Sequence, residues 1–304
     1  MSVHHGFLLA ALILFILGPG CERPPADQGP HYQSSPPVPQ GVVHTFAVHP
    51  LHNPKKLYSS YQPLVDYLNQ HLTGARLELE ASRDYGHFEA KYQARIPHIL
   101  LPNPWQTLQA MKVGYHVIAS AGAPEDFKGL FIVRRDSSLR FPADLKGRAV
   151  SYPSPTALAA CILPQYFLFQ HGINVRTEVE NRYVGSQESS IMNVYLGQTA
   201  AGATWPPPWR AFQKDHPREA RELKVLWETP SLLNNSVMVR DDLPPAITDD
   251  LRKALVHLHE SREGRTILAT METTRFVPAT DQDYKVVRGF VDRFERDVRQ
   301  VGGQ

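Results

Sequence analysis

The sequence has little of what marks several common protein classes. Its 304 residues include only two cysteines, Cys21 and Cys161, which are too few for a disulfide framework. The formal net charge is only +2, with basic residues dispersed among acidic ones, so no strong field favours nucleic acid as a partner. Hydrophobic residues make up 42% and charged residues 20% of the chain, which indicates a globular protein with a sizeable core.

Common catalytic motifs are also missing. The sequence contains no G-x-S-x-G elbow, no H-E-x-x-H motif and no G-x-x-x-x-G-K-[ST] loop. His49 and His52 lie three residues apart, but no third ligand follows at a defined spacing, which favours solvated or cleft-lining histidines over a metal site. We therefore expect a protein that is not an enzyme and that needs no metal or cofactor, with a hydrolase as the weakest alternative.

The N-terminal region has the features of a targeting segment. The apolar run Phe7–Leu17 is short for a membrane span and typical of a signal peptide. Gly18, Pro19 and Gly20 then precede Cys21, an order similar to the cleavage site of bacterial lipoproteins. We predict a signal peptide over residues 1–20, acylation of Cys21 and a flexible tether over residues 21–41. A plain signal peptide followed by an unmodified cysteine is the alternative.

Strand-like and helix-like stretches alternate from Val42 onward. Apolar strands are expected at residues 42–48, 99–101, 115–119 and 130–133, with amphipathic helices between them. This alternation predicts an α/β protein with mainly parallel sheets and helices on both faces. The pattern restarts near Leu145 and changes again near Val237. We therefore expect a monomer of two lobes, with lobe 1 at residues 42–134 and 236–304 and lobe 2 at residues 135–235.

A hydroxyl-rich turn and an apolar helix follow the apolar run with a turn signal at residues 144–150. Ser154 and Thr156 come at the helix start, where free N–H groups and the helix dipole can hold an anion. From this stretch alone, an ordinary capped helix after a strand is the simpler interpretation. Pro164 removes an intrahelical hydrogen bond and predicts a kink or two short helices. One apolar face is expected to contain Leu158, Cys161, Ile162, Tyr166 and Phe169, which makes Cys161 a small buried hydrophobic residue.

An ordered set of motifs runs through the chain. Tyr-x-Pro-Leu-x-x-Tyr-Leu at 61–68 is followed by Asp-Leu-Lys-Gly-x-x-Val at 144–150, the Ser154 turn, and Gly185-Ser186 before another helix. From about Val42 to the C-terminus, this order resembles the periplasmic solute-binding proteins of phosphonate, phosphite and phosphate ABC importers. The resemblance implies a two-lobe periplasmic-binding-protein type II clamp that captures a phosphorus oxyanion in the cleft between its lobes.

The resemblance also implies which residues hold the oxyanion. The family uses hydroxyls and amides at the Ser/Thr helix start, an early tyrosine and the Gly-Ser turn. The ligand-binding residues expected from it, together with neighbouring cleft positions, are Tyr85, Asn103, Ser154, Thr156, Ala157, Ser186, Gln187, Glu188 and Trp205. There are structural alternatives for several of these residues. Tyr85 would then be a structural tyrosine, and Glu188 would complement the helix dipole. Three tryptophans could likewise be core aromatics: Trp105, Trp205 and Trp209.

The chain departs from the family pattern at three places. Pro155, Thr156, Ala157 and Leu158 stand where Ser-Thr-Ser-Gly is usual, Gln187-Glu188 replaces a His-Asp pair, and Ala200 replaces an acid. The expected partners are a small oxyanion, a membrane through the lipid anchor, and an ABC permease or a membrane sensor kinase. The expected location is the periplasm or the outer face of the cell membrane.

Overall fold

The computed structural model describes residues 41–302, so the predicted signal peptide, Cys21 and nearly all of the tether lie outside the described residues. The strands are β1 (Val42–Val48), β2 (Ala75–Ala81), β3 (Ile99–Leu101), β4 (Tyr115–Ala121), β5 (Leu130–Arg134), β6 (Ala149–Tyr152), β7 (Glu180–Tyr183), β8 (Ala201–Thr204), β9 (Leu223–Glu228), β10 (Ser236–Arg240) and β11 (Phe276–Pro278). The helices are α1 (Pro54–His71), α2 (Tyr85–Gln93), α3 (Pro104–Met111), α4 (Leu163–Gln170), α5 (Gln187–Tyr195), α6 (Pro206–Asp215), α7 (Pro217–Ala220), α8 (Pro245–His257), α9 (Arg262–Thr270) and α10 (Lys285–Asp297).

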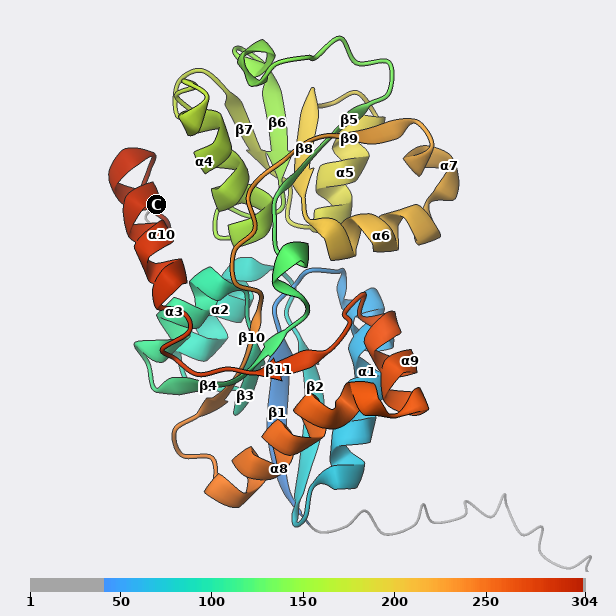
Figure 1. Ribbon diagram of the computed structural model, residues 1–304, viewed down its shortest axis with the longest axis vertical. Coiled ribbons are helices and arrows are strands. Elements are labelled where there is room, and N and C mark those ends of the chain that lie inside the picture. The colour runs from blue at the N-terminus through green and yellow to red at the C-terminus, as the bar shows by residue number, and fades with distance from the viewer. Residues whose placement is uncertain (1–40, 303–304) are drawn as a thin grey trace, which may run out of the picture. The chain divides into compact units, whose positions relative to one another are not determined.

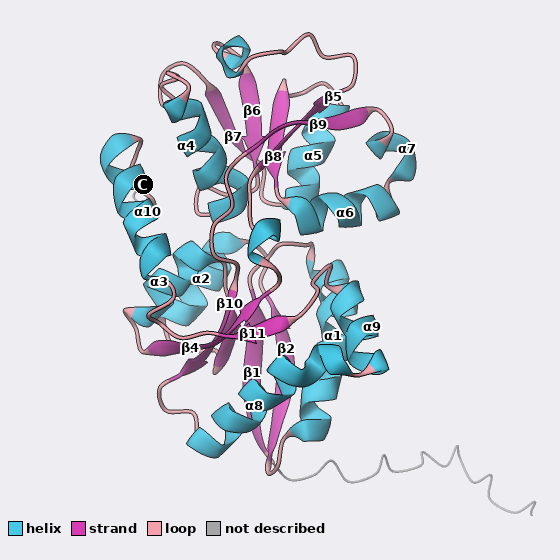
Figure 2. Cartoon of the chain, viewed as in Figure 1, coloured by secondary structure: helices cyan, strands magenta, loops and turns pink. Residues whose placement is uncertain are grey.

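The strands form two separate sheets. One has the order β11-β4-β10-β3-β1-β2 and the other β7-β6-β8-β5-β9. Figure 1 shows each sheet in its own lobe, and Figure 2 shows helices flanking both sheets. The predicted α/β architecture of two lobes is confirmed.

The strand directions correct the prediction of mainly parallel sheets. β1 runs parallel to β2 and β3, and β6 runs parallel to β7 and β8. By contrast, β5, β10 and β11 run antiparallel to their neighbours. β5 and β10 each enter a sheet from the other lobe, so each starts at the edge where the parallel strands end. Both sheets are therefore mixed.

The predicted lobe boundary at residue 134 is also corrected. β5 pairs with β8 and β9 and so belongs to the five-stranded sheet of lobe 2. The chain leaves the first sheet at Ala121 and rejoins it at Ser236. The four apolar residues 130–133 would fit a buried strand in either lobe, and their hydrophobicity alone could not assign them.

Alternation along β5 explains why helices cover both faces of the second sheet. Leu130 and Ile132 pack with α5 and α6 residues in one apolar cluster, whereas Phe131 and Val133 join the main core beside α4. Successive strand residues point to opposite faces, so an uninterrupted apolar strand requires cover on both. Cys161 lies in that main core, fully buried as predicted, and burial raises the pKa of its thiol to about 12. Phe169, predicted on the same apolar face, is instead 38% exposed.

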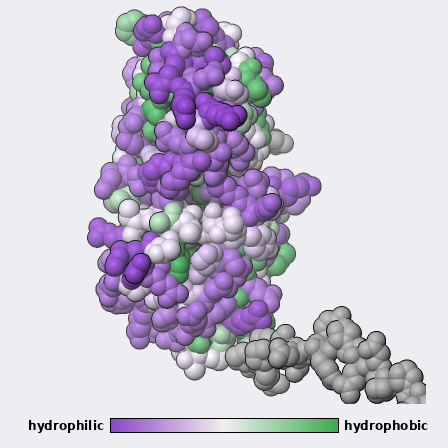
Figure 3. All heavy atoms as spheres, turned by 90° about the vertical axis from the view of Figure 1, so that its right-hand side faces the viewer, coloured by the Kyte–Doolittle hydropathy of each residue, from purple (hydrophilic) through white to green (hydrophobic). Residues whose placement is uncertain are grey.

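The outer surface gives a separate observation. No helix among residues 41–302 is both long and apolar enough to cross a membrane. The face of the described region that carries α1, α6 and α9 is mostly hydrophilic (Figure 3).

Two adjacent chain segments, residues 122–129 and 229–235, connect the lobes. The amide of Leu232 donates to the carbonyl of Phe127 at 2.9 Å, and the amide of Thr229 donates to the carbonyl of Gly129 at 2.9 Å. The Gly129 amide in turn donates to the Thr229 hydroxyl at 2.8 Å. These bonds hold the crossing segments side by side, so their paired backbone positions the lobes.

His49, in the loop after β1, is a buried titratable group next to this junction. Its side chain is 2% exposed, and its Nδ1 donates to the carbonyl of Leu101 at 2.9 Å. Burial lowers the pKa of His49 from 6.5 to about 4, because charging the ring would cost its hydration. The folded protein therefore holds this ring neutral at pH 7.

We predict that the free energy of unfolding falls as the pH drops from 6.5 to 4. In that window the unfolded chain protonates His49 and the folded chain does not, so the stability is full above pH 6.5 and is lost toward the folded pKa of about 4. The loss from this group is about 3 kcal/mol. His49→Asn, whose amide can replace the Nδ1–H donor but cannot titrate, should reduce the loss in urea titrations at several pH values.

His71→Asn is the matched control for that measurement. Its Nδ1 contacts the carbonyl of Tyr67 at 2.8 Å on an exposed part of α1. The control should retain the pH dependence of the wild type. An unchanged pH dependence in His49→Asn would show that this ring does not carry the effect.

Candidate functional site

A recess lies where the parallel strands of both lobes end. The connections after β1, β2, β3, β6, β7 and β8 contribute to it, as do the two crossing segments. Ligands of open α/β sheets bind at such carboxyl ends. It is lined by His49, Tyr85, Asn103, Phe127, Ala157, Leu158, Ala159, Ala160, Gln187, Trp205 and Asn235.

The helix start after β6 brings backbone donors to this recess. Residues 158–162 form one π-helical turn before α4, and the carbonyl of Ala157 accepts from the amide of Ile162 at 3.2 Å. In an α-helix that carbonyl would bind the amide of Cys161. The N–H groups of residues 158–161 are therefore left without an acceptor in the helix, one more than an α-helix would leave. Pro164, predicted to cause a kink or a split, follows the π-turn as the second residue of α4.

A tyrosine hydroxyl from the other lobe also lines the recess. Tyr85, the first residue of α2, accepts a hydrogen bond from Nε2 of Gln187 at 3.3 Å, which leaves its own proton free to donate. The Gln187 amide is oriented by the buried Thr204, whose hydroxyl donates to Oε1 at 2.9 Å. Burial raises the pKa of Tyr85 well above its ordinary value, so the hydroxyl remains a neutral donor.

Among residues 41–302, no lysine, arginine or carboxylate lines the recess. Its polar groups are amides, the Tyr85 hydroxyl, and the side chains of His49, Asn103, Gln187 and Asn235. Oδ1 of Asn235 is buried and finds no hydrogen-bond partner among the described residues. Buried polar atoms normally have partners, and because this oxygen can only accept, its partner in a bound ligand would have to be an O–H or N–H group. Nowhere in residues 41–302 do three His, Cys, Asp or Glu side chains form a group that could hold a metal ion.

Five of the predicted ligand residues come together here. Tyr85, Ala157, Gln187 and Trp205 line the recess, and so does Asn103. The Asn103 side chain is largely occupied, because it caps α3 and its Nδ2 donates to the carbonyl of Thr156 at 3.2 Å. Trp205 packs on Phe127 at a ring distance of 5.5 Å. Trp105 and Trp209 are not in the lining and are buried in the core.

Ser154 and Thr156 do not line the recess. The Thr156 hydroxyl donates to Oε1 of Glu89 at 2.6 Å. The Ser154 hydroxyl lies 3.0 Å from the Thr156 hydroxyl. Glu89 belongs to α2 of the other lobe and also accepts from Gln106 at 3.0 Å. Burial raises the pKa of the Glu89 carboxyl. The two hydroxyls thus form a polar contact between the lobes, and the backbone of the next turn faces the recess.

Ser186 and Glu188 also lie outside the recess lining. Ser186 caps α5, accepting from the amide of Ser189 at 3.0 Å. Glu188 pairs with Nε2 of His216 at 3.2 Å, in a second hollow beside His52 and Lys56. Sequence reasoning missed Phe127 and Asn235, which lie in irregular crossing segments without any periodic pattern. The only signal was the polar pair Asn234-Asn235 directly before an apolar strand.

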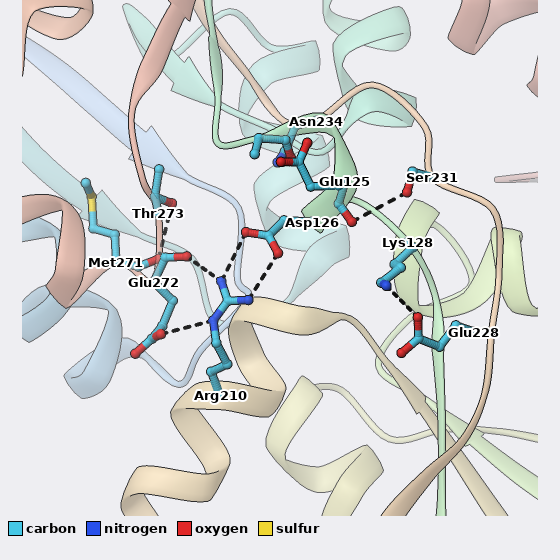
Figure 4. Close-up of polar contacts among 11 residues, drawn as sticks. Glu125, Asp126, Lys128, Arg210, Glu228, Ser231, Asn234, Met271, Glu272 and Thr273 are labelled. Carbon is cyan, nitrogen blue, oxygen red and sulfur yellow. Dashed lines mark hydrogen bonds and ion pairs between the residues drawn. The ribbon is translucent and has the colours of Figure 1, made fainter. Parts of the chain in front are cut away.

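Ion pairs join the lobes on the side of α6. Arg210 reaches Asp126 of the first crossing segment through two contacts of 3.1 and 3.3 Å, and its Nε lies 3.3 Å from Oε2 of Glu272 (Figure 4). Lys214 pairs with the same Glu272, and Lys56 of lobe 1 pairs with Asp215 of lobe 2. These contacts hold the described lobes together outside the recess.

Glu272 is unusual in its backbone as well as its charge. Its φ is 53°, a left-handed conformation that costs free energy for a residue other than glycine. Its side chain is only 12% exposed, and its carbonyl accepts from Arg210 at 2.8 Å. The cations of α6 therefore compensate both a strained backbone and a partly desolvated carboxylate.

Comparison with known proteins is consistent with this geometry. The family of periplasmic substrate-binding proteins of phosphonate ABC transporters matches residues 46–284. A probable phosphite-binding ABC transporter protein, PhnD1 of Prochlorococcus marinus (strain MIT 9301), is 24% identical over 182 residues. That alignment covers 56% of this chain and 61% of the relative, so the chain aligns with less than two thirds of the relative's length.

Two solved structures share the fold. A binding component of an ABC phosphonate transporter from Pseudomonas aeruginosa superposes with a TM-score of 0.77 and 18% identity, covering 84% of this chain and 88% of that one. PhnD1 in complex with methylphosphonate gives a TM-score of 0.75 and 20% identity over 85% of this chain and all of that one. With the family match spanning most of the sequence, the chain belongs to the periplasmic substrate-binding proteins of phosphonate ABC transporters.

Proposed function

We propose that the recess captures a small phosphorus oxyanion, a phosphonate, phosphite or phosphate, and that the protein delivers it to an ABC permease. One observation carries the proposal: the backbone of residues 158–160, whose N–H groups have no acceptor in the helix, and the Tyr85 hydroxyl come from opposite lobes to one recess. The protein acts by binding and release, and none of these groups is a catalytic residue.

Neutral donors suit this ligand. Amides at a helix start bind oxyanions through hydrogen bonds and the helix dipole, without a counter-charge that would itself have to be desolvated. Each hydrogen bond to a charged oxygen is worth roughly 1.5–3 kcal/mol. The absence of a carboxylate from the lining also matters, because a buried like charge would oppose the ligand.

The walls of the recess limit the ligand further. Phe127, Leu158 and Trp205 give it apolar walls, which favour a tetrahedral anion whose one substituent is small and apolar. The similarity to PhnD1, solved with methylphosphonate, supports the same ligand class.

A thermal-shift panel tests the ligand class. Phosphate, phosphite, methylphosphonate and 2-aminoethylphosphonate should raise the melting temperature, and sulfate should raise it less. A ligand at ~100 times its dissociation constant adds about 2.7 kcal/mol to stability. Uptake of the tightest ligand should disappear in cells that lack the protein. A panel with no shift for any phosphorus oxyanion would contradict the proposal.

Tyr85→Phe and Thr156→Ala separate the donors from the interlobe contact. Tyr85→Phe removes a proposed ligand donor, so calorimetry should show weaker methylphosphonate binding by about 10- to 150-fold. Thr156→Ala removes the hydroxyl contacts to Glu89 and Ser154 but no proposed ligand contact, and its affinity should fall by less than about 10-fold.

Thr156→Ser is the control for that pair, because it retains the hydroxyl and should bind like the wild type. A larger loss in Thr156→Ala than in Tyr85→Phe would mean that the Thr156 hydroxyl, as first expected from sequence, contacts the anion after all.

We further propose that Cys21 carries a lipid that tethers the protein to a membrane. The motivation is the apolar run 7–17 followed by small residues and a cysteine. A fatty-acid analogue fed to cells should label the wild type and leave Cys21→Ser unlabelled. Cys161→Ser is the control and should be labelled fully, since that thiol is buried in the core. Equal labelling of Cys21→Ser and wild type would refute the anchor.

A further inference from the structure

Arg299, two residues beyond α10, lies directly behind the helix start that faces the recess. Its Nη2 donates to the carbonyl of Pro155 at 2.8 Å and lies 3.6 Å from the Cys161 sulfur. Its Nε donates to Oε1 of Gln165 at 2.7 Å. The guanidinium thus contacts three positions around the turn whose amides line the recess.

The charge of this guanidinium is not neutralised nearby. Among residues 41–302, most arginines with short side-chain contacts pair with a carboxylate, such as Arg210 with Asp126 and Arg240 with Asp242. Arg299 has no carboxylate within 4 Å in that range, and its hydrogen-bond acceptors are neutral groups. It also stacks 5.3 Å from the centre of the Phe294 ring, which limits its hydration from one side.

The position of Arg299 is fixed by the C-terminal helix. α10 follows β11 of lobe 1 and contacts α3, while its Phe290 packs edge-on against Tyr166 of lobe 2 at 5.2 Å (Figure 1). Phe294, on the next turn, lies 6.5 Å from the same ring. The helix therefore anchors its C-terminal end on lobe 2, beside the Pro155 turn.

From this arrangement we infer that Arg299 is a positioning and charge-selecting residue for the bound anion. It orients the Pro155 turn through the carbonyl bond, and its unpaired positive charge adds to the helix dipole behind the free amides of residues 158–160. This inference rests on the proposed function. Arg299 would make the site prefer dianions over monoanions through its charge, without contacting the ligand.

Charge dependence is what distinguishes this role from a structural one. The Coulomb energy between Arg299 and the ligand is proportional to the ligand charge, so removing the cation should cost a dianion twice the free energy that it costs a monoanion. A change in the turn's geometry alone would weaken both charge states by the same factor. The second ionisation of a phosphonate falls near neutrality, so one ligand can supply both states without a change of shape.

The experiment is calorimetry of methylphosphonate on the purified full-length protein at about pH 6 and about pH 9, where the monoanion and dianion predominate. Arg299→Gln should weaken dianion binding about 10-fold and monoanion binding about 3-fold. Arg299→Lys keeps the charge and loses the planar donor pair, so it should retain the wild-type ratio between the two pH values with a lower affinity at both.

Arg288→Gln is the matched control, since it removes one positive charge from an exposed position on the same helix. Its affinities should equal those of the wild type at both pH values. The inference is overturned if the wild type binds and a folded Arg299→Gln protein loses affinity by the same factor for monoanion and dianion, or loses none. If the wild type binds neither state, the proposed function itself fails.

Discussion

The paired crossing of the chain between the two sheets is the constraint on which the site depends. Residues 122–129 and 229–235 are hydrogen-bonded to each other, and each leads directly into a strand that starts at the interface. Because β5 and β10 start there, the parallel strands beside them must end there. The connections after β1, β2, β3, β6, β7 and β8 consequently meet at the interface between the lobes.

Charge is distributed around this meeting point in a consistent way. The recess itself contains neutral groups: backbone amides and the protonated Tyr85 hydroxyl donate, and His49 is held uncharged by burial. Ion pairs between the lobes lie on the α6 side, where Arg210 joins Asp126 and Glu272. Arg299 supplies an unpaired cation from behind the helix start. A small anion in the recess would therefore experience a favourable field while its immediate neighbours remain neutral, which keeps the desolvation cost of the site low.

Sequence patterns predicted the elements better than their assembly. The alternation of apolar strands and amphipathic helices identified the fold, and the turn after β6 was identified as an anion-binding candidate. The hydroxyls of Ser154 and Thr156 were expected to face the ligand. Instead, the Thr156 hydroxyl donates a hydrogen bond to Glu89, which is distant in the sequence. Strand direction, the lobe of β5 and the role of Arg299 likewise depend on contacts between distant segments, which periodicity along one segment cannot report.

The most direct measurement is a crystal structure of the protein with methylphosphonate. We expect phosphonate oxygens at about 2.7–3.1 Å from backbone nitrogens of residues 158–160 and at hydrogen-bond distance from the Tyr85 hydroxyl. We also expect that Thr156 still donates to Glu89 and that Arg299 remains bound to the Pro155 carbonyl in the complex. A phosphonate bound in the hollow beside His52 and Lys56, with the amides of residues 158–160 unoccupied, would contradict this expectation.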